Sequence, residues 1–304
     1  MVDLEDCDVP MPTPNDFPDP LDIRAVVFSN WIPLCELVGR LSRTLRRKRA
    51  VCGKSAAQLA HDLVSWVKSL PPALLPDFKH SKTSSFHRDV HGLHLTYLMA
   101  ITLLHLNSKD GGTLPGASIA AVAAASCTAR IFHDYLVRGS VNFLTGQPTW
   151  YAAIAVLALL HARRVVSLTA HADEDIHILR TTLKVMAPKW HSARMFESGI
   201  EKLMASKVDG LGLQNNELPI QPHFMARTAM PSSLDHENSL TASTNWEEYF
   251  PFATKDTSLL ISALMTHITQ PVESSQPDWI TSSPTHPSHY FMEHGDVSLD
   301  FLNL

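Results

Sequence analysis

The sequence predicts an all-α protein, in which a multi-helix bundle is followed by a largely disordered acidic tail. Between positions 23 and 205, apolar residues recur every three or four positions in one segment after another, which is the period of an amphipathic helix. No segment has the pattern of a convincing strand. After position 205 the chain is rich in Pro, Ser, Thr and acidic residues, a composition that cannot bury enough apolar surface to fold.

Length and composition fit a globular core that carries some irregular polypeptide. The chain has 304 residues, of which 45% are hydrophobic and 18% charged, and it contains 20 prolines. Its first 22 residues hold seven acidic side chains and no Lys or Arg, so neither a secretory signal nor a mitochondrial presequence is predicted. The apolar runs stop well short of the roughly 18 residues that a membrane span needs. We therefore expect a soluble chain with no membrane partner.

The four cysteines, Cys7, Cys35, Cys52 and Cys127, lie 28, 17 and 75 positions apart. This spacing contains no C-x-x-C pair for zinc and no dense framework of disulfides. We expect reduced thiols in a reducing compartment.

The chain begins with a proline-rich lead-in over residues 1–22. Each proline lacks an N–H and restricts the residue before it, so this segment is predicted to be extended. The helical domain is predicted to span residues 23–205. Its first helix covers residues 23–45, and Pro33 is expected to kink or divide that helix.

The second helix is predicted to start at a capping box. Ser55 and Gln58 have the required spacing, and the apolar stripe that follows ends at the Pro71–Pro72 pair. The alanine-rich residues 117–129 predict a helix in the interior of the bundle, because alanine lets helix backbones approach closely. Further helices are predicted over residues 86–106, 117–139, 148–171, 173–186 and 193–205.

The predicted tail, residues 206–304, differs from the rest of the chain in charge. It holds 12 Asp or Glu and three Lys or Arg, so its net charge is -9, against +4 for residues 1–205. One amphipathic stretch, residues 257–268, interrupts it. Two acidic islands rich in aromatic residues lie at 246–252 and 290–304.

Three histidines are the best metal candidate in the sequence. His87, His91 and His94 stand four and three positions apart, which would align their side chains along one face of a helix. The alternative is a set of exposed or capping histidines, since H-E-x-x-H is absent and local spacing places no catalytic carboxylate beside them.

The sequence predicts no enzyme and no cofactor. The pairs His61–Asp62 and His133–Asp134 suggest an all-helical metal-dependent hydrolase, yet pairs of this kind are expected by chance in a chain with 17 histidines. Activated-serine and nucleotide-binding motifs do not occur. The hydrolase using the histidine stripe remains the alternative from another functional class.

A dense basic run closes the first predicted helix. Six of the ten residues from Arg40 to Arg49 are cations, and Arg46, Arg47, Lys48 and Arg49 are contiguous. Such a run predicts a nuclear import signal or a patch that binds an anionic partner. The alternative is a solvated helix C-terminus, whose negative dipole end favours cations.

The aromatic residues of the two acidic islands are candidate anchors of a transcriptional activation segment, because acidic neighbours keep such side chains solvated until a coactivator groove accepts them. The alternative is a tail that docks on its own bundle. The candidate anchors are Trp246, Tyr249, Phe250, Phe252, Tyr290, Phe291 and Phe301.

Six blocks occur in order along the chain: DCDVPMPTPNDF, SWVKSLPPAL, FHRDVHGLHLTYLMAITLLHL, ASCTARIFHDYLVRGSVNFLTG, WYAAIAVLALLHARR and WHSARMFESGIEKL. Together they resemble the regulatory middle region of fungal zinc-cluster transcription factors, particularly the cutinase-transcription-factor-like branch. The resemblance covers about residues 1–205. In that family the first block follows several helices, so the resemblance implies a domain truncated at its N-terminus.

The resemblance implies a nuclear regulator of carbon use or secondary metabolism that works through protein contacts with the transcription machinery or coactivators. The family's DNA-binding module needs six closely spaced cysteines that share two zinc ions, and this sequence lacks them. We therefore expect no sequence-specific DNA binding by this chain alone. A truncated product without independent function is a further alternative.

Overall fold

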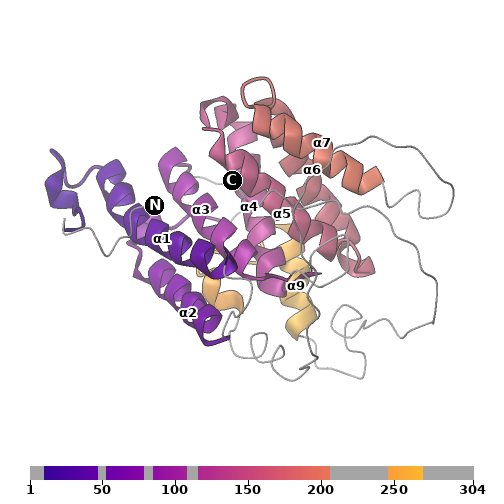
Figure 1. Cartoon of the computed structure of the whole chain (residues 1–304), viewed down its shortest axis with the longest axis horizontal. Coiled ribbons are helices and arrows are strands. Elements are labelled where there is room, and N and C mark those ends of the chain that lie inside the picture. The colour runs from indigo at the N-terminus through magenta and orange to yellow at the C-terminus, as the bar shows by residue number, and fades with distance from the viewer. Residues whose placement is uncertain (1–9, 47–52, 79–84, 108–115, 206–245, 270–304) are drawn as a thin grey trace.

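A computed structural model describes residues 10–46, 53–78, 85–107, 116–205 and 246–269 of the chain. It confirms the all-α fold class (Figure 1). Two short strands of two residues each, β1 (Leu106–Asn107) and β2 (Gly116–Ala117), pair antiparallel in the connection between the third and fourth helices. The helices are α1 (Ile23–Arg46), α2 (Gly53–Ser69), α3 (Arg88–Leu104), α4 (Ile119–Val137), α5 (Gln147–Ala162), α6 (Thr169–Met186), α7 (His191–Ala205) and α9 (Leu259–Thr269).

Helix α4 lies at the centre of the bundle, in contact with α3, α5, α6 and α9. Helices α1 and α2 lie at one end of the molecule and α6 and α7 at the other (Figure 1). Nearly every side chain of α4 from Ala120 to Phe132 is buried. The small alanine side chains let several neighbouring helices approach α4 at once, which confirms the predicted interior position of residues 117–129.

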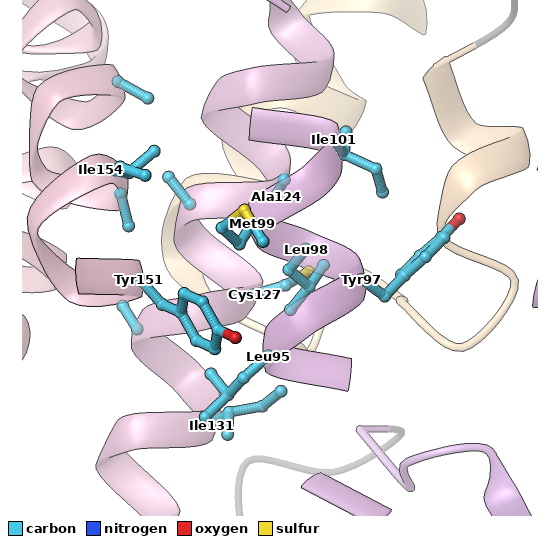
Figure 2. Close-up of a cluster of buried hydrophobic side chains, with 14 of the residues drawn as sticks. Leu95, Tyr97, Leu98, Met99, Ile101, Ala124, Cys127, Ile131, Tyr151 and Ile154 are labelled. Carbon is cyan, nitrogen blue, oxygen red and sulfur yellow. The ribbon is translucent and has the colours of Figure 1, made fainter. Parts of the chain in front are cut away.

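Figure 2 shows the apolar cluster at this centre, where side chains of α3, α4 and α5 meet. Cys127 of α4 is fully buried there, and burial raises the pKa of its thiol, so it acts as a small apolar side chain. Tyr97 extends from α3 toward the C-terminal part of the chain, on the side opposite Tyr151 (Figure 2). Helix α3 therefore serves two surfaces, one facing α4 and α5 and the other facing the C-terminal residues.

The expected division of the first helix at Pro33 does not occur, since α1 is one helix from Ile23 to Arg46. A proline inside a helix removes a hydrogen bond from the preceding turn. The indole Nε1 of Trp66 in α2 donates to the carbonyl oxygen of Asn30 at 3.1 Å, so tertiary packing supplies a donor to the turn before the proline. Pro33 itself lies on the exposed side of the helix.

The predicted capping box at the start of α2 is also wrong. The helix begins at Gly53, which places Ser55 inside its first turn. The side chain of Gln58 donates to Asp62 one turn later, at 2.8 Å, instead of reaching back to the helix start. The spacing of Ser55 and Gln58 therefore matched the motif without forming it.

The predicted helix over residues 148–171 is divided in the structure. Helix α5 ends at Ala162, a 3-10 turn follows at Val166–Leu168, and α6 begins at Thr169. The hydroxyl of Thr169 donates to the carbonyl oxygens of Arg163 and Val165, both at 3.0 Å, which stabilises the turn. The break is set by these side-chain contacts and not by Pro or Gly, so the sequence pattern did not show it.

Part of the predicted tail is ordered. Residues 246–269 contain a 3-10 turn, Trp246–Tyr249, and helix α9, and they pack on the bundle; α9 lies at the amphipathic stretch predicted over residues 257–268. The remainder of the predicted tail, residues 206–245 and 270–304, lies outside the described residues. In the described part of the chain, no helix has both the length and the hydrophobicity that crossing a bilayer requires.

Candidate functional site: the docking surface of the C-terminal segment

Residues 246–266, hereafter the C-terminal segment, fold against one side of the bundle. Its 3-10 turn contacts α2 and α4, and α9 contacts α4 and α6. Four aromatic residues predicted as solvated activation anchors are buried here, so for them the structure shows the alternative, a segment docked on its own bundle. Their exposed fractions are 8% for Trp246, 0% for Tyr249, 3% for Phe250 and 6% for Phe252.

Six bundle residues, hereafter the docking surface, hydrogen-bond the segment, pair with its charge or pack on its aromatic rings. They come from α2, α3, α4 and the residues that flank α3. They are Lys68, Phe78, His94, Tyr97, His105 and Ser126.

Tyr249 is held by polar contacts at both ends. Its carbonyl oxygen accepts a hydrogen bond from the Tyr97 hydroxyl at 2.9 Å, and its own hydroxyl lies 3.0 Å from His105 Nε2. Burial lowers the pKa of His105 to about 4, so the imidazole is neutral at physiological pH. Two neutral polar groups of the bundle thus recognise one tyrosine of the segment.

Phe252 packs against two rings, that of Phe78 in the α2–α3 connection and that of His94 in α3. Its ring centroid lies 5.8 Å from that of Phe78 and 5.0 Å from that of His94, both edge to face. The Nε2 atom of His94 donates to the Leu74 carbonyl oxygen at 2.7 Å, which fixes the tautomer because a carbonyl can only accept. Burial lowers the pKa of His94 to about 4, so this ring is also neutral.

The edge of the docking surface is charged and hydrated. Lys68 Nζ lies 2.6 Å from Glu248 Oε2, and the two side chains are 51% and 46% exposed. Nearby, the Thr254 hydroxyl donates to the Phe78 carbonyl oxygen at 3.5 Å. The site therefore has an aromatic centre and a polar rim, the arrangement of protein–peptide interfaces.

A buried polar chain lies beneath α9. Ser126 Oγ of α4 donates to Asp175 Oδ2 of α6 at 2.5 Å and lies 2.6 Å from Ser258 Oγ. Ser258 in turn accepts from the backbone N–H of Ile261 at 3.0 Å, as an N-cap residue of α9 does. Burial raises the pKa of Asp175 to about 7, against the opposing effect of the Ser126 hydrogen bond. The docked segment is thus connected through Ser126 to a buried carboxyl group whose pKa burial raises.

The predicted histidine stripe does not form a metal site. His91 Nδ1 donates to the His87 carbonyl oxygen at 2.8 Å, and the His94 ring is committed to Leu74. His91 and His94 are buried among aromatic rings, so they are core residues and not the exposed histidines that the alternative described. Among the described residues, no group of three or more His, Cys, Asp or Glu is arranged to hold a metal ion.

The two His–Asp pairs also differ from the hydrolase pattern. His61 and His133 are exposed, while Asp134 is buried. Asp62 forms an ion pair with Arg40 of α1, with 2.7 Å between Arg40 Nη1 and Asp62 Oδ2. In each pair the histidine is at the surface and the carboxylate has another role: Asp62 pairs with Arg40, and Asp134 is buried.

Two predicted sites fall largely outside the described residues. Arg46 is the last residue of α1, whereas Arg47, Lys48 and Arg49 lie beyond the described part. Arg40, Arg43 and Arg46 of the basic run thus lie in α1. The aromatic residues Tyr290, Phe291 and Phe301 also lie outside the described part.

Most residues of the docking surface could not be predicted from the sequence, because polar side chains on predicted helices carry no local sign of a distant partner. Asp175, which is hydrogen-bonded to Ser126 of the docking surface, does carry such a sign. It stands four positions before Leu179, and so on the stripe that Ala172, Leu179 and Leu183 bury. A carboxylate on an apolar stripe is a signal that could have been used.

The packing around α9 is tight. A cavity of about 10 Å³ lies between Leu264 and residues of α4, α5 and the turn before α6, enough for roughly one water molecule. A wider groove of about 370 Å³ lies between α1 and α2. Comparison with known proteins returns nothing: no family model, no curated protein and no solved structure matches this chain.

Proposed function

We propose that this chain is the regulatory and effector part of a transcription regulator of the fungal zinc-cluster type. It acts in the nucleus through contacts with the transcription machinery or coactivators, and it does not read DNA sequence by itself. The proposal starts from the ordered blocks that resemble the family's middle region. These blocks supply much of α2, α3, α4, α5 and α7, which pack around the same core.

The observation that carries the proposal is the docked C-terminal segment. Its composition, W-E-E-Y-F-P-F, is typical of an acidic activation segment, and the bundle holds it through a defined set of contacts. A bundle that holds such a segment on its surface has the parts that a regulatory domain needs, namely an effector segment and a place to keep it. The aromatic residues of the second island remain the candidate anchors for a coactivator.

The test is a reporter assay with the full chain fused to a heterologous DNA-binding module. We expect activation, and we expect the triple variant Tyr290→Ala, Phe291→Ala, Phe301→Ala to remove most of it at equal nuclear protein levels. Val166→Ala, at a position that is 92% exposed, is the control. Reporter output that is absent, or that survives the triple variant, contradicts the proposal.

Nuclear import is tested separately. The assay uses a fluorescent fusion that is too large to pass the nuclear pore by diffusion. Replacing Arg46, Arg47, Lys48 and Arg49 with Ala is expected to shift this fusion from the nucleus to the cytoplasm. Arg24→Ala is the matched control, because Arg24 is an exposed cation at the opposite end of the same helix, paired locally with Asp22. Unchanged nuclear accumulation of the four-residue variant contradicts an import role for the run.

A further inference from the structure

We propose that the docking surface is a recognition site for acidic, aromatic-rich peptides, and that the C-terminal segment is its built-in, detachable ligand. The inference stands independently of any role in transcription. It assigns the docking surface a partner of defined chemistry.

The first argument is the anatomy of the contact. Its centre consists of aromatic side chains in desolvated sites, with Tyr249 completely buried, and its rim is the hydrated Lys68–Glu248 pair. Interfaces between separate proteins are built this way, with a few aromatic anchors that carry most of the affinity and a polar rim around them. The lysine on the bundle also places a positive charge opposite an acidic residue of the segment.

The second argument is that the segment makes its own local structure. The backbone N–H of Thr254 donates to the Thr257 hydroxyl at 2.8 Å, and that of Asp256 donates to the Thr254 hydroxyl at 3.3 Å. Ser258 caps α9 from within the segment. A peptide with these residues carries its turn and its helix cap with it, as a detachable ligand must.

The third argument is electrostatic. Docking holds His105 and Asp175 in environments that disfavour their charged forms, because burial lowers the pKa of His105 and raises that of Asp175. The groups that act on Asp175 are Ser126 and the Cys127 thiol from α4, the neighbouring Glu174 from α6 and, through Ser126, Ser258 before α9. None of these supplies a positive charge. Release of the segment would expose His105 and Asp175 to water, where their charged forms are solvated. This gain in solvation favours the released state and so makes docking reversible.

The fourth argument is the connection. The segment is joined to α7 through residues 206–245, so every contact it makes with the bundle is distant in sequence. The covalent connection makes docking an intramolecular step, so an effective concentration on the order of 1 mM would keep a segment whose free peptide binds with a Kd of about 10 µM docked roughly 99% of the time. Moderate affinity is enough to keep the site filled and still lets a competing peptide enter.

The experiment uses the full chain with a specific protease site inserted between residues 206 and 245. The protein is purified, cleaved and diluted, and a fluorescent synthetic peptide of residues 246–266 is added. We expect the cleaved C-terminal fragment to leave and the labelled peptide to bind in its place, with a Kd in the micromolar range measured by polarisation. Uncleaved protein should bind the same peptide at least tenfold more weakly, because its own segment competes.

Adjacent leucines provide a matched pair of peptide variants. Leu260 is buried and Leu259 is 59% exposed, although both begin the same helix. The Leu260→Ser peptide is expected to bind at least tenfold more weakly than the wild type, and the Leu259→Ser peptide within about twofold. The mutations are in the peptide, so the folding of the bundle is unaffected by them.

Three results overturn the proposal. The first is a fragment that stays with the cleaved protein at nanomolar concentration and does not exchange with the labelled peptide. The second is equal binding of the Leu259→Ser and Leu260→Ser peptides. The third is aggregation of the cleaved bundle that excess wild-type peptide does not prevent. If the peptide exchanges as expected while the reporter fusion stays silent, this inference holds and the proposed function fails.

Discussion

The centre of the bundle and the docking surface are both buried, yet they are built from different chemistry. At the centre, α4 presents alanines and a protonated cysteine to α3 and α5, so that packing alone determines the fit (Figure 2). At the docking surface, the buried side includes His105, Ser126 and, behind it, Asp175, each hydrogen-bonded to a partner that arrives from elsewhere in the chain. The first region is sensitive to volume, and the second is sensitive to protonation.

This contrast teaches that burial alone does not distinguish a permanent core from a regulated contact. Separating apolar surfaces in water costs free energy at any pH, whereas buried titratable groups gain solvation when the surfaces around them separate. The two regions should therefore respond to different perturbations. The predictions below exploit that difference, from the largest expected effect to the smallest.

The largest effect is expected from adding volume at the centre. Ala124 is fully buried where α4 meets its neighbours, so Ala124→Leu forces the helices apart and should cost about 3 kcal/mol of global stability. Urea unfolding followed by circular dichroism measures the change. Val137→Leu, at an exposed position on the same helix, is the control. A well-tolerated Ala124→Leu would mean that the centre is loosely packed.

A smaller effect, with a defined pH dependence, is expected at Asp175. Its pKa in the folded protein, about 7, lies above the ordinary value of 3.8, so the folded state binds more protons between pH 4 and 7. Its contribution to stability is therefore complete below about pH 4 and is lost as the pH rises from 4 to 7. Asp175→Asn should stabilise the folded protein at both pH values, and the gain at pH 8 should exceed the gain at pH 5 by roughly 2–3 kcal/mol.

Hydrogen exchange of residues 246–266 at the two pH values measures this effect. Asp173→Asn is the control, because Asp173 is an exposed carboxylate of the same helix, paired with Arg163. Equal effects of Asp175→Asn at pH 5 and pH 8 would show that the carboxyl group does not ionise near neutrality.

Acid should weaken the same contact through His105. Because burial lowers its folded pKa to about 4, the unfolded state binds more protons than the folded state below pH 6.5. Stability is therefore lost as the pH falls from 6.5 toward 4, by about 2 kcal/mol at pH 5 for this residue. His105→Gln keeps a hydrogen-bonding group and should remove this part of the acid sensitivity, whereas the exposed His133→Gln should not.

The smallest effect is expected at the rim. Lys68 and Glu248 are about half exposed, so their ion pair should contribute no more than about 0.5 kcal/mol and should weaken with added salt. A double-mutant cycle with Lys68→Met and Glu248→Gln measures the coupling between them. A coupling well above 1 kcal/mol would show that the rim, and not the aromatic centre, holds the segment.

Several features of the fold were predictable because they depend on local pattern. Helical periodicity predicted the class and the approximate bounds of α1, α3, α4 and α7. Where the helix bounds differ from the prediction, side-chain contacts are present that hydrophobic periodicity does not show. The Trp66 indole supports the turn before Pro33, and Thr169 stabilises the turn that divides α5 from α6. The histidine stripe failed in the same way, because equal spacing along a helix does not say what surrounds each ring.

By itself, the sequence determined that this chain is helical and that the alanine-rich residues 117–129 lie inside, because side-chain size and apolar period act within one helix. Only the tertiary structure decided the fate of the acidic, aromatic island at 246–252. Its composition suits solvent and a coactivator as well as it suits an aromatic site on its own bundle. The choice depends on Tyr97, His105 and Ser126, which lie more than 100 positions away in the chain and meet the segment only when α3 and α4 pack. Burial of an aromatic ring requires a complementary surface, and such a surface exists only in the folded molecule.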